Sequence, residues 1–253
     1  MQGEVLKPSA FMTNFLAFCR QRSVPLDFFS WHTYGNKPWE MVARARAVRR
    51  ILDEYGYKQA ESHLNEWNYL PGGHWLSATK EGQGLKREQW AADMAGPSAA
   101  AFAACTLMAL QDSPLDMANF FTGEIQMLGL FSFEGVPKKT FYAFKAFREL
   151  LETPERVETS GAVEGQLAVL AGTRQDHRMA AVLVSNYEFA GDLTLNLKHL
   201  PWPGATRVDV LLVDSDHNLA STQKTELPAE DSTVVLAMKK PSVALIKLSP
   251  VSP

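Results

Sequence analysis

The residues best suited to chemistry lie at positions 63–68, in the segment His-Leu-Asn-Glu-Trp-Asn. Glu66 stands where the pattern predicts the end of a buried strand, and polar and aromatic side chains flank it. A site that cleaves a glycosidic bond presents one of its catalytic carboxylates in this way, and both retaining and inverting mechanisms need a second carboxylate across the bond. The sequence offers no equally convincing partner for Glu66, so the segment predicts half of such a site.

An earlier predicted strand supplies polar groups that could serve this carboxylate. Its period of two places four side chains on one face, namely Phe28, Ser30, His32 and Tyr34. We expect Tyr34 to donate its hydroxyl to Glu66 and to hold it in line. We expect His32 to bond a sugar hydroxyl or Glu66. The alternatives are an aromatic core residue for Tyr34 and a satisfied core histidine for His32.

The loop that follows this carboxylate is rich in rings and glycine. Its rings belong to Trp67, Tyr69, His74 and Trp75. Flat rings stack on the apolar faces of sugars, so we expect Trp67 and Trp75 to contact substrate, although each ring taken singly is equally consistent with packing. Asn68 either fixes the loop or contacts substrate, and the sequence does not separate these roles.

Helices and strands alternate in the first part of the chain. The periodicities predict helices at about 9–22, 38–55, 87–110 and 140–151, and strands at about 26–34, 59–67 and 116–122. This alternation predicts a parallel sheet with right-handed crossovers. Active residues of such sheets lie at the carboxyl ends of strands, where His32, Tyr34 and Glu66 are expected. Within the second strand, a period of two predicts Ser62, Leu64 and Glu66 on one face.

After residue 155 the chain changes to short β-rich runs separated by turn signals. The runs are 166–170, 179–185, 193–197, 207–213, 232–236 and 242–248. Their spacing predicts a small antiparallel sandwich. We therefore expect two domains, an α/β domain over residues 1–155 and an all-β domain over residues 156–253.

Composition limits the classes of function. The 253 residues are 46% hydrophobic with a formal net charge of -3, the profile of a globular protein with one or two cores. The densest basic cluster, Arg44 to Arg50, alternates with apolar residues at helical spacing and is interpreted as a solvated helix face, so we expect no nucleic-acid partner. Cys19 and Cys105 lie in apolar helical patterns and are interpreted as buried free thiols.

Targeting signals and other catalytic motifs are not found. Residues 1–4 start no export signal and no apolar run reaches the length of a membrane span, so a cytoplasmic location is expected if Met1 is the true start, and the location is otherwise unknown. The stretch 214–218 begins like a calcium loop, but Leu219 replaces the required Gly and Thr225 the required Glu. We expect no metal and no organic cofactor.

The order of four segments resembles glycoside hydrolase family 39, the β-xylosidase and α-L-iduronidase family of retaining (β/α)8-barrel glycosidases. Residues 27–34 resemble its sixth barrel strand, which ends in a His-x-Tyr pair, and residues 65–68 resemble the seventh strand with the nucleophile. Residues 129–144 resemble its Gly-Leu turn and eighth helix, although Lys139 stands where Pro is more usual. Residues 213–218 resemble an Asp-x-x-His-x-Asn stretch of its C-terminal β-domain.

The resemblance implies an α/β fold, the C-terminal part (about strands 6–8) of a (β/α)8 barrel followed by a β-sandwich. Asn-Glu also marks the fourth strand of this clan, but Pro usually follows there, whereas Trp67 follows here. The acid/base Glu of the fourth strand should lie about 95 residues before Glu66, which is upstream of Met1. Glu124 is the other nearby carboxylate expected at this end of the sheet.

The implied activity is that of a retaining, β-xylosidase-like O-glycoside hydrolase in which Glu66 is the nucleophile and the acid/base is lacking from this chain. The rival hypothesis is a non-catalytic carbohydrate-binding or interaction protein derived from a glycosidase. We expect a carbohydrate as partner and no membrane. An open sheet exposes an edge and a face, so a missing N-terminal barrel half, or self-association, is also expected. The sugar and its linkage do not follow from these residues.

Overall fold

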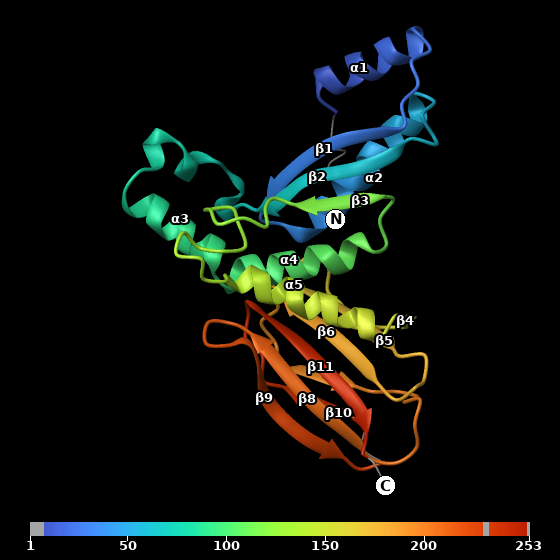
Figure 1. The fold of residues 1–253 in the computed structure, drawn as a ribbon, viewed down its shortest axis with the longest axis vertical. Coiled ribbons are helices and arrows are strands. Elements are labelled where there is room, and N and C mark those ends of the chain that lie inside the picture. Colours follow the sequence, from blue (N-terminus) through green and yellow to red (C-terminus); the bar gives the residue numbers. More distant parts are fainter. Residues whose placement is uncertain (1–7, 230–232, 252–253) are drawn as a thin grey trace.

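The computed structural model describes residues 8–229 and 233–251 of the chain. The molecule is elongated, with an α/β half at one end and a β half at the other (Figure 1). The elements of the α/β half are α1 (Ala10–Gln21), β1 (Phe28–Gly35), α2 (Pro38–Glu54), β2 (Glu61–Tyr69), α3 (Leu85–Ala95), α4 (Pro97–Leu110), β3 (Met117–Phe120) and α5 (Lys139–Glu149). Short 3-10 turns lie at Pro71–Gly73, Leu76–Ala78, Lys80–Gly82 and Leu150–Glu152.

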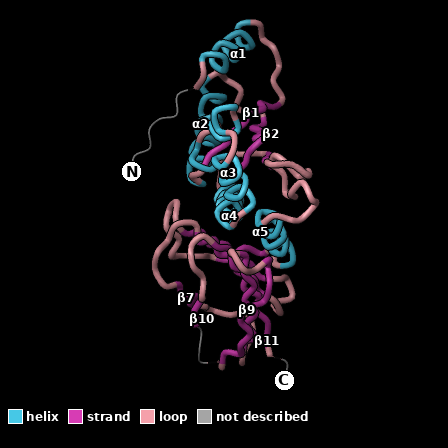
Figure 2. The backbone as a smooth tube through the Cα atoms, turned by 90° about the vertical axis from the view of Figure 1, so that its left-hand side faces the viewer, coloured by secondary structure: helices cyan, strands magenta, loops and turns pink. Residues whose placement is uncertain are grey.

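The sheet of the α/β half is parallel, with strand order β1-β2-β3. This confirms the predicted alternation and the predicted parallel pairing. Helices α2 and α4 lie on one side of the sheet (Figure 2). Met41 of α2 and Phe102 of α4 lie in one hydrophobic core with Leu64 of β2. The carboxyl ends of β1 and β2 therefore lie side by side, as the chemistry at His32, Tyr34 and Glu66 requires.

The predicted single helix over 87–110 is two helices, α3 and α4, which meet at an angle of 47°. The break falls at Gly96 and Pro97, because proline cannot donate a backbone hydrogen bond and disfavours helical geometry in the residue before it. Pro97 then begins α4 at a position where a missing N–H costs nothing. In the described part of the chain no single helix is long and apolar enough to cross a membrane. Helices α3 and α4 taken together have the length and composition of a membrane span, but most residues of α4 are buried inside the protein.

The β half contains two sheets. Six antiparallel strands follow the order β4 (Glu155–Val157), β5 (Leu167–Thr173), β6 (Ala180–Asn186), β11 (Ser242–Pro250), β8 (Thr206–Val213) and β9 (Asn218–Leu227). A smaller sheet pairs β7 (Leu193–Asn196) with β10 (Thr233–Leu236). All six predicted runs correspond to strands, although Ser232 lies outside the described residues. Strands β4 and β9 were not predicted, and both are largely exposed edge strands with polar sequences.

The large sheet of the β half is covered on both faces. One face packs against α4 and α5, where Leu183 and Leu245 share a core with Phe102. The opposite face packs against the small sheet, where Val182 and Ile246 lie in a second core. Every residue of β6 is consequently buried, which explains the apolar run from Ala180 to Val184.

Candidate functional site

A β-bulge gives Glu66 its direction. The register between β1 and β2 shifts after Trp31, so that His32 pairs with Glu66 while Trp31 pairs with Leu64. One extra residue in β2 therefore lets Asn65 and Glu66 both face the side of the sheet away from the helices.

The prediction that Ser62, Leu64 and Glu66 share a face is therefore wrong. Ser62 and Leu64 are fully buried on the helix side, where the Ser62 hydroxyl accepts a hydrogen bond of 3.1 Å from the Trp31 indole. Glu66 lies on the opposite face because the bulge interrupts the period of two.

The carboxylate of Glu66 is held by side chains from β1. The Tyr34 hydroxyl donates a hydrogen bond of 2.7 Å to Glu66 Oε2, and His32 Nδ1 lies 3.4 Å from the same oxygen. Burial, with the hydrogen bond and charge of Glu66, raises the pKa of Tyr34 far above its usual value, so the phenol keeps its proton and remains a donor. The hydrogen bond expected from the sequence is present, and the face predicted for His32 and Tyr34 is correct.

Trp75 forms a wall beside this pair. Its ring meets the Tyr34 ring edge-on, with centroids 5.0 Å apart, and 42% of the residue is exposed. Tyr34 thus lies between Glu66 and the partly exposed ring of Trp75. A sugar ring has polar edges and apolar faces, so its apolar face could stack on Trp75 while its hydroxyl groups bond to Glu66 and Tyr34.

Trp67 and Asn68 require correction as substrate-contacting residues. Trp67 is 0% exposed, because its ring points to the helix side and packs against Phe120 and Phe144 at centroid distances of 5.2 and 6.1 Å. Asn68 is also buried, and its amide donates to the backbone carbonyls of Phe121 (2.5 Å) and Leu128 (2.7 Å). Of the two readings left open for Asn68, these contacts favour fixing the loop.

Lys138, directly before α5, also supports that loop, whereas Lys139 joins the start of α5 to the β half. Lys138 is buried and its ammonium donates to the carbonyls of Gln126 (2.8 Å) and Met127 (2.7 Å), while burial lowers its pKa to about 8. Lys139 donates to Asn218 of the β half at 2.8 Å. The sequence signal for these contacts is the pair of adjacent lysines at the amino terminus of a helix. A positive charge there is unfavourable with respect to the helix dipole, so such a lysine is expected to have specific hydrogen-bond acceptors.

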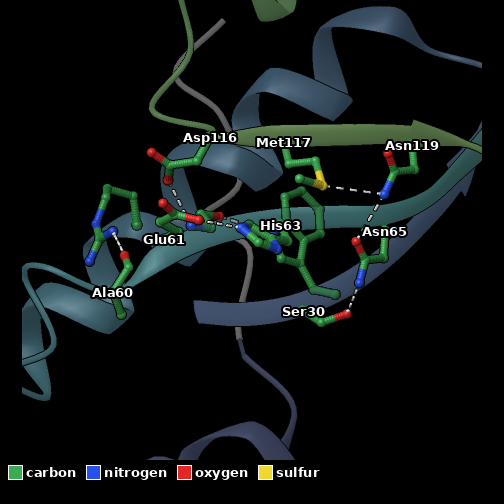
Figure 3. A network of polar contacts seen from close by, with 11 residues as sticks. Ser30, Ala60, Glu61, His63, Asn65, Asp116, Met117 and Asn119 are labelled. Atoms are coloured by element: carbon green, nitrogen blue, oxygen red, sulfur yellow. Dashed lines mark hydrogen bonds and ion pairs between the residues drawn. The ribbon is translucent and has the colours of Figure 1, made fainter. Parts of the chain in front are cut away.

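A second polar feature crosses all three strands on the face opposite α2 and α4 (Figure 3). Asn65 donates to Ser30 at 2.8 Å, and Asn119 donates to Asn65 at 3.1 Å. Beside this ladder, His63 and Glu61 approach to 2.7 Å. The sequence argument placed Ser30 on this face but missed Asn119, whose position in the alternation of β3 was the available signal.

Glu124 and the two cysteines are the remaining candidate groups. Glu124 is exposed in the loop after β3 and accepts a hydrogen bond from Gln126 at 2.9 Å; no hydrogen bond joins it to Glu66 in the described part of the chain. Cys19 and Cys105 are free and buried, as predicted. Over residues 8–229 and 233–251, no cluster of three or more His, Cys, Asp or Glu side chains is arranged to hold a metal ion.

Comparison with known proteins defines the class of fold. No protein-family model matches the chain, and no curated protein matches it. Structures that it resembles include several glycoside hydrolases, which supports a glycosidase fold for the chain. Two of them are an α-L-arabinofuranosidase from Thermotoga maritima in complex with arabinose (16% identity, TM-score 0.60, 93% of this chain and 55% of that chain) and a GH30 endoxylanase from Clostridium papyrosolvens (14%, 0.55, 88% and 49%).

A third similar structure is that of a glucosidase from Croceicoccus marinus. The two sequences are 27% identical, and the TM-score is 0.74 over 98% of this chain. The match covers 59% of the glucosidase, so this chain spans little more than half the length of that protein.

Proposed function

We propose that this chain supplies the nucleophile half of a retaining O-glycoside hydrolase that resembles family 39 and acts on β-xylosides or related oligosaccharides. In this proposal residues 1–155 are part of a (β/α)8 barrel and residues 156–253 form a β-sandwich domain. The observation that carries the proposal is the Tyr34–Glu66 hydrogen bond at the carboxyl ends of parallel strands. The glycosidase fold of the similar structures supports it.

In a retaining reaction Glu66 attacks the anomeric carbon as a carboxylate, and the bond from that carbon to the leaving oxygen breaks. Because Tyr34 engages Oε2, Oε1 is the oxygen left to attack. A water molecule then cleaves the glycosyl ester and restores the carboxylate. The acid/base that protonates the leaving oxygen and activates this water belongs to a further segment of the intact enzyme.

His32 and Trp75 contact substrate in this proposal. The His32 side chain is half exposed beside Glu66 and can bond a sugar hydroxyl next to the reacting carbon. Trp75 supplies the stacking surface, since its ring is exposed and already fixed against Tyr34.

A trapping experiment tests the nucleophile without requiring the acid/base. 2,4-Dinitrophenyl 2-deoxy-2-fluoro-β-xyloside carries a leaving group that departs without protonation, and its fluorine slows hydrolysis of the glycosyl-enzyme. We expect one adduct per chain by intact mass spectrometry, and none in Glu66→Gln. The matched control Glu124→Gln should label like the parent. Equal labelling of Glu66→Gln and the parent would contradict the proposal.

The second candidate is a non-catalytic carbohydrate-binding or interaction protein. It is favoured by one observation, the Trp75 ring, which is 42% exposed against Tyr34 and offers a stacking surface for a sugar that needs no chemistry at Glu66. Binding of xylo-oligosaccharides that is lost in Trp75→Ala but retained in Glu66→Gln, with no adduct in the parent, would support this reading. Turnover of an aryl xyloside or arabinoside, abolished by Glu66→Gln, would exclude it.

A further inference from the structure

The loop that carries Trp75 runs from residue 70 to residue 84, between β2 and α3, and projects beyond the sheet (Figure 1). Most of its residues are exposed, including Trp75 at 42% and Leu76 at 45%. A loop that buries so little surface needs other contacts to hold a ring at a fixed place. The edge-on contact of the Trp75 ring with Tyr34 therefore depends on how the backbone of this loop is held.

The backbone of Trp75 opens a short 3-10 turn, Leu76–Ala78. The Trp75 carbonyl accepts the first hydrogen bond of this turn, from the Ala78 amide at 2.9 Å. The Leu76 carbonyl accepts the next one, from the Thr79 amide at 3.0 Å. As in any helical turn, the last carbonyls have no partner within the turn itself. The carbonyls of residues 77–79 must therefore be bound by other groups if the turn is to hold its shape.

Arg87 binds all three of these carbonyls with one guanidinium group. Its Nε donates to Ser77 at 3.0 Å, and its Nη2 donates to Ala78 at 3.3 Å and to Thr79. Arg87 lies in the first turn of α3, where the helix dipole disfavours a positive charge, and these three acceptors offset that cost. A guanidinium presents its donors in a rigid planar fork, so it can serve several carbonyls at once, whereas a lysine ammonium is a single point charge.

Gly82 shows how closely the same loop is folded on itself. It is buried, and a Cβ at this position would lie 2.3 Å from Ser77 Cα and 2.5 Å from the Leu76 carbonyl oxygen. The next turn of the loop, Lys80–Gly82, therefore packs directly on the backbone of the turn after Trp75. Arg87 and Gly82 thus fix the same stretch of backbone by two different kinds of contact.

We propose that Arg87 is a positioning residue, which acts through the backbone of residues 77–79 to hold the Trp75 ring against Tyr34 before a ligand binds. Its role in catalysis rests on the proposed function, in which Trp75 contacts the sugar. Because the contacts of Arg87 are made to this loop, its effect falls on sugar binding rather than on attack by Glu66. A ring that is already fixed loses little conformational freedom when a sugar stacks on it, which favours affinity.

Fluorine NMR of the chain labelled with fluorotryptophan tests the positioning without any glycoside. The resonance of Trp75 is the one that disappears in Trp75→Phe. In Arg87→Met we expect this resonance to move toward that of a free, solvated fluorotryptophan, and the amides of residues 78 and 79 to exchange faster with solvent. The matched control Lys86→Met removes the neighbouring exposed cation and should change neither. Gly82→Ala, which displaces the same backbone, should reproduce the effect of Arg87→Met.

Trapping by the fluoroxyloside then separates positioning from general support of the fold. It yields a dissociation constant for the reversible complex and a rate constant for esterification. Arg87→Met should raise the dissociation constant about tenfold, the size of one lost stacking contact, and leave the rate constant within about twofold. In a Trp75→Ala background the same substitution should have no further effect, because the ring through which Arg87 acts is absent.

Two results would overturn the inference. One is a Trp75 resonance that Arg87→Met leaves in place. The other is a loss of affinity in Arg87→Met that is equally large in the parent and in the Trp75→Ala background. If the resonance moves as expected but the parent neither binds nor reacts with the fluoroxyloside, the positioning of Trp75 by Arg87 is supported and the proposed function fails instead.

Discussion

The two halves of the molecule differ in how their sheets are covered. In the β half the six-stranded sheet lies between α4 and α5 on one side and the small sheet on the other, and β6 is buried at every residue. In the α/β half the three-stranded sheet has helices on one side and a polar ladder on the other. The candidate catalytic carboxylate, Glu66, lies in the less covered half, because a carboxylate that contacts a ligand must be accessible from solvent.

The better-covered half also supports the site through defined contacts. The Ser185 hydroxyl donates to the carbonyl of Ala101 in α4 at 2.7 Å, and Lys247 contacts Glu149 of α5 at 2.6 Å. The Tyr187 hydroxyl donates to the carbonyl of Asn36, directly after β1, at 2.6 Å. The β half is thus joined to the helices that hold the site and to the end of β1.

The largest loss of stability should come from a mutation in the core that the two halves share. Leu183→Ala should lower the free energy of unfolding by about 2–5 kcal/mol, because Leu183 is fully buried between the large sheet and the helices. Phe28→Ala, on the face opposite α2 and α4, should cost less than about 1 kcal/mol, because Phe28 is half exposed. Urea denaturation followed by circular dichroism measures both. Equal losses would show that the two sheets are equally packed.

A somewhat smaller loss is expected at the loop support. Asn68→Ala removes two buried hydrogen bonds to the loop carbonyls and should cost about 1–3 kcal/mol. Hydrogen exchange should accelerate over residues 121–128, while the strands of the β half keep their protection. Asn65→Ala, whose bonds lie on the more open face, is the matched control and should cost less. An equal cost for the two variants would break the contrast between covered and open faces.

Some features of the fold and the site could be predicted from the sequence, and others could not, for physical reasons. The alternation of helices and strands follows from local periodicity. The Tyr34–Glu66 bond was expected because both residues lie at the carboxyl ends of neighbouring parallel strands. The bulge at Asn65 does not, because one inserted residue changes the face of every later side chain without changing composition. The burial of Trp67 depends on Phe120 and Phe144, which are far along the chain. The polar edge strand β9 lacks the apolar pattern by which strands are predicted.

At the site itself, Tyr34→Phe should slow trapping by the fluoroxyloside about tenfold. The variant removes the hydroxyl that fixes Oε2 of Glu66 and leaves the ring against Trp75. Pseudo-first-order inactivation rates measure this effect, and a thermal melt controls for folding. Unchanged trapping with an unchanged melt would assign Tyr34 to packing alone.

The smallest expected effect is a pH dependence at Lys138. Burial lowers the pKa of Lys138 to about 8 in the folded chain, from the usual 10.5 of a lysine, so between these values the unfolded chain binds more protons. Stability contributed by this residue should therefore rise with pH through that interval, by an amount on the order of 1 kcal/mol. The difference in unfolding free energy between the parent and Lys138→Met, measured at pH 7.5 and 9.5, tests this.

The control for that experiment is Lys145→Met, which removes an exposed lysine from the same helix. Its difference from the parent should be the same at both pH values. A Lys138→Met difference that stays constant, or that shifts in the opposite direction, would show that the Lys138 ammonium is not desolvated in the folded chain.

Identification of the residue esterified by the fluoroxyloside tests the central claim most directly. Peptic digestion at low pH preserves the glycosyl ester, and tandem mass spectrometry of the peptide around residues 61–69 locates it. The account predicts a single ester on Glu66, on the open side of β2 beside Tyr34. An ester on Glu124 or any other carboxylate, or no ester in a chain that binds the sugar, would contradict it.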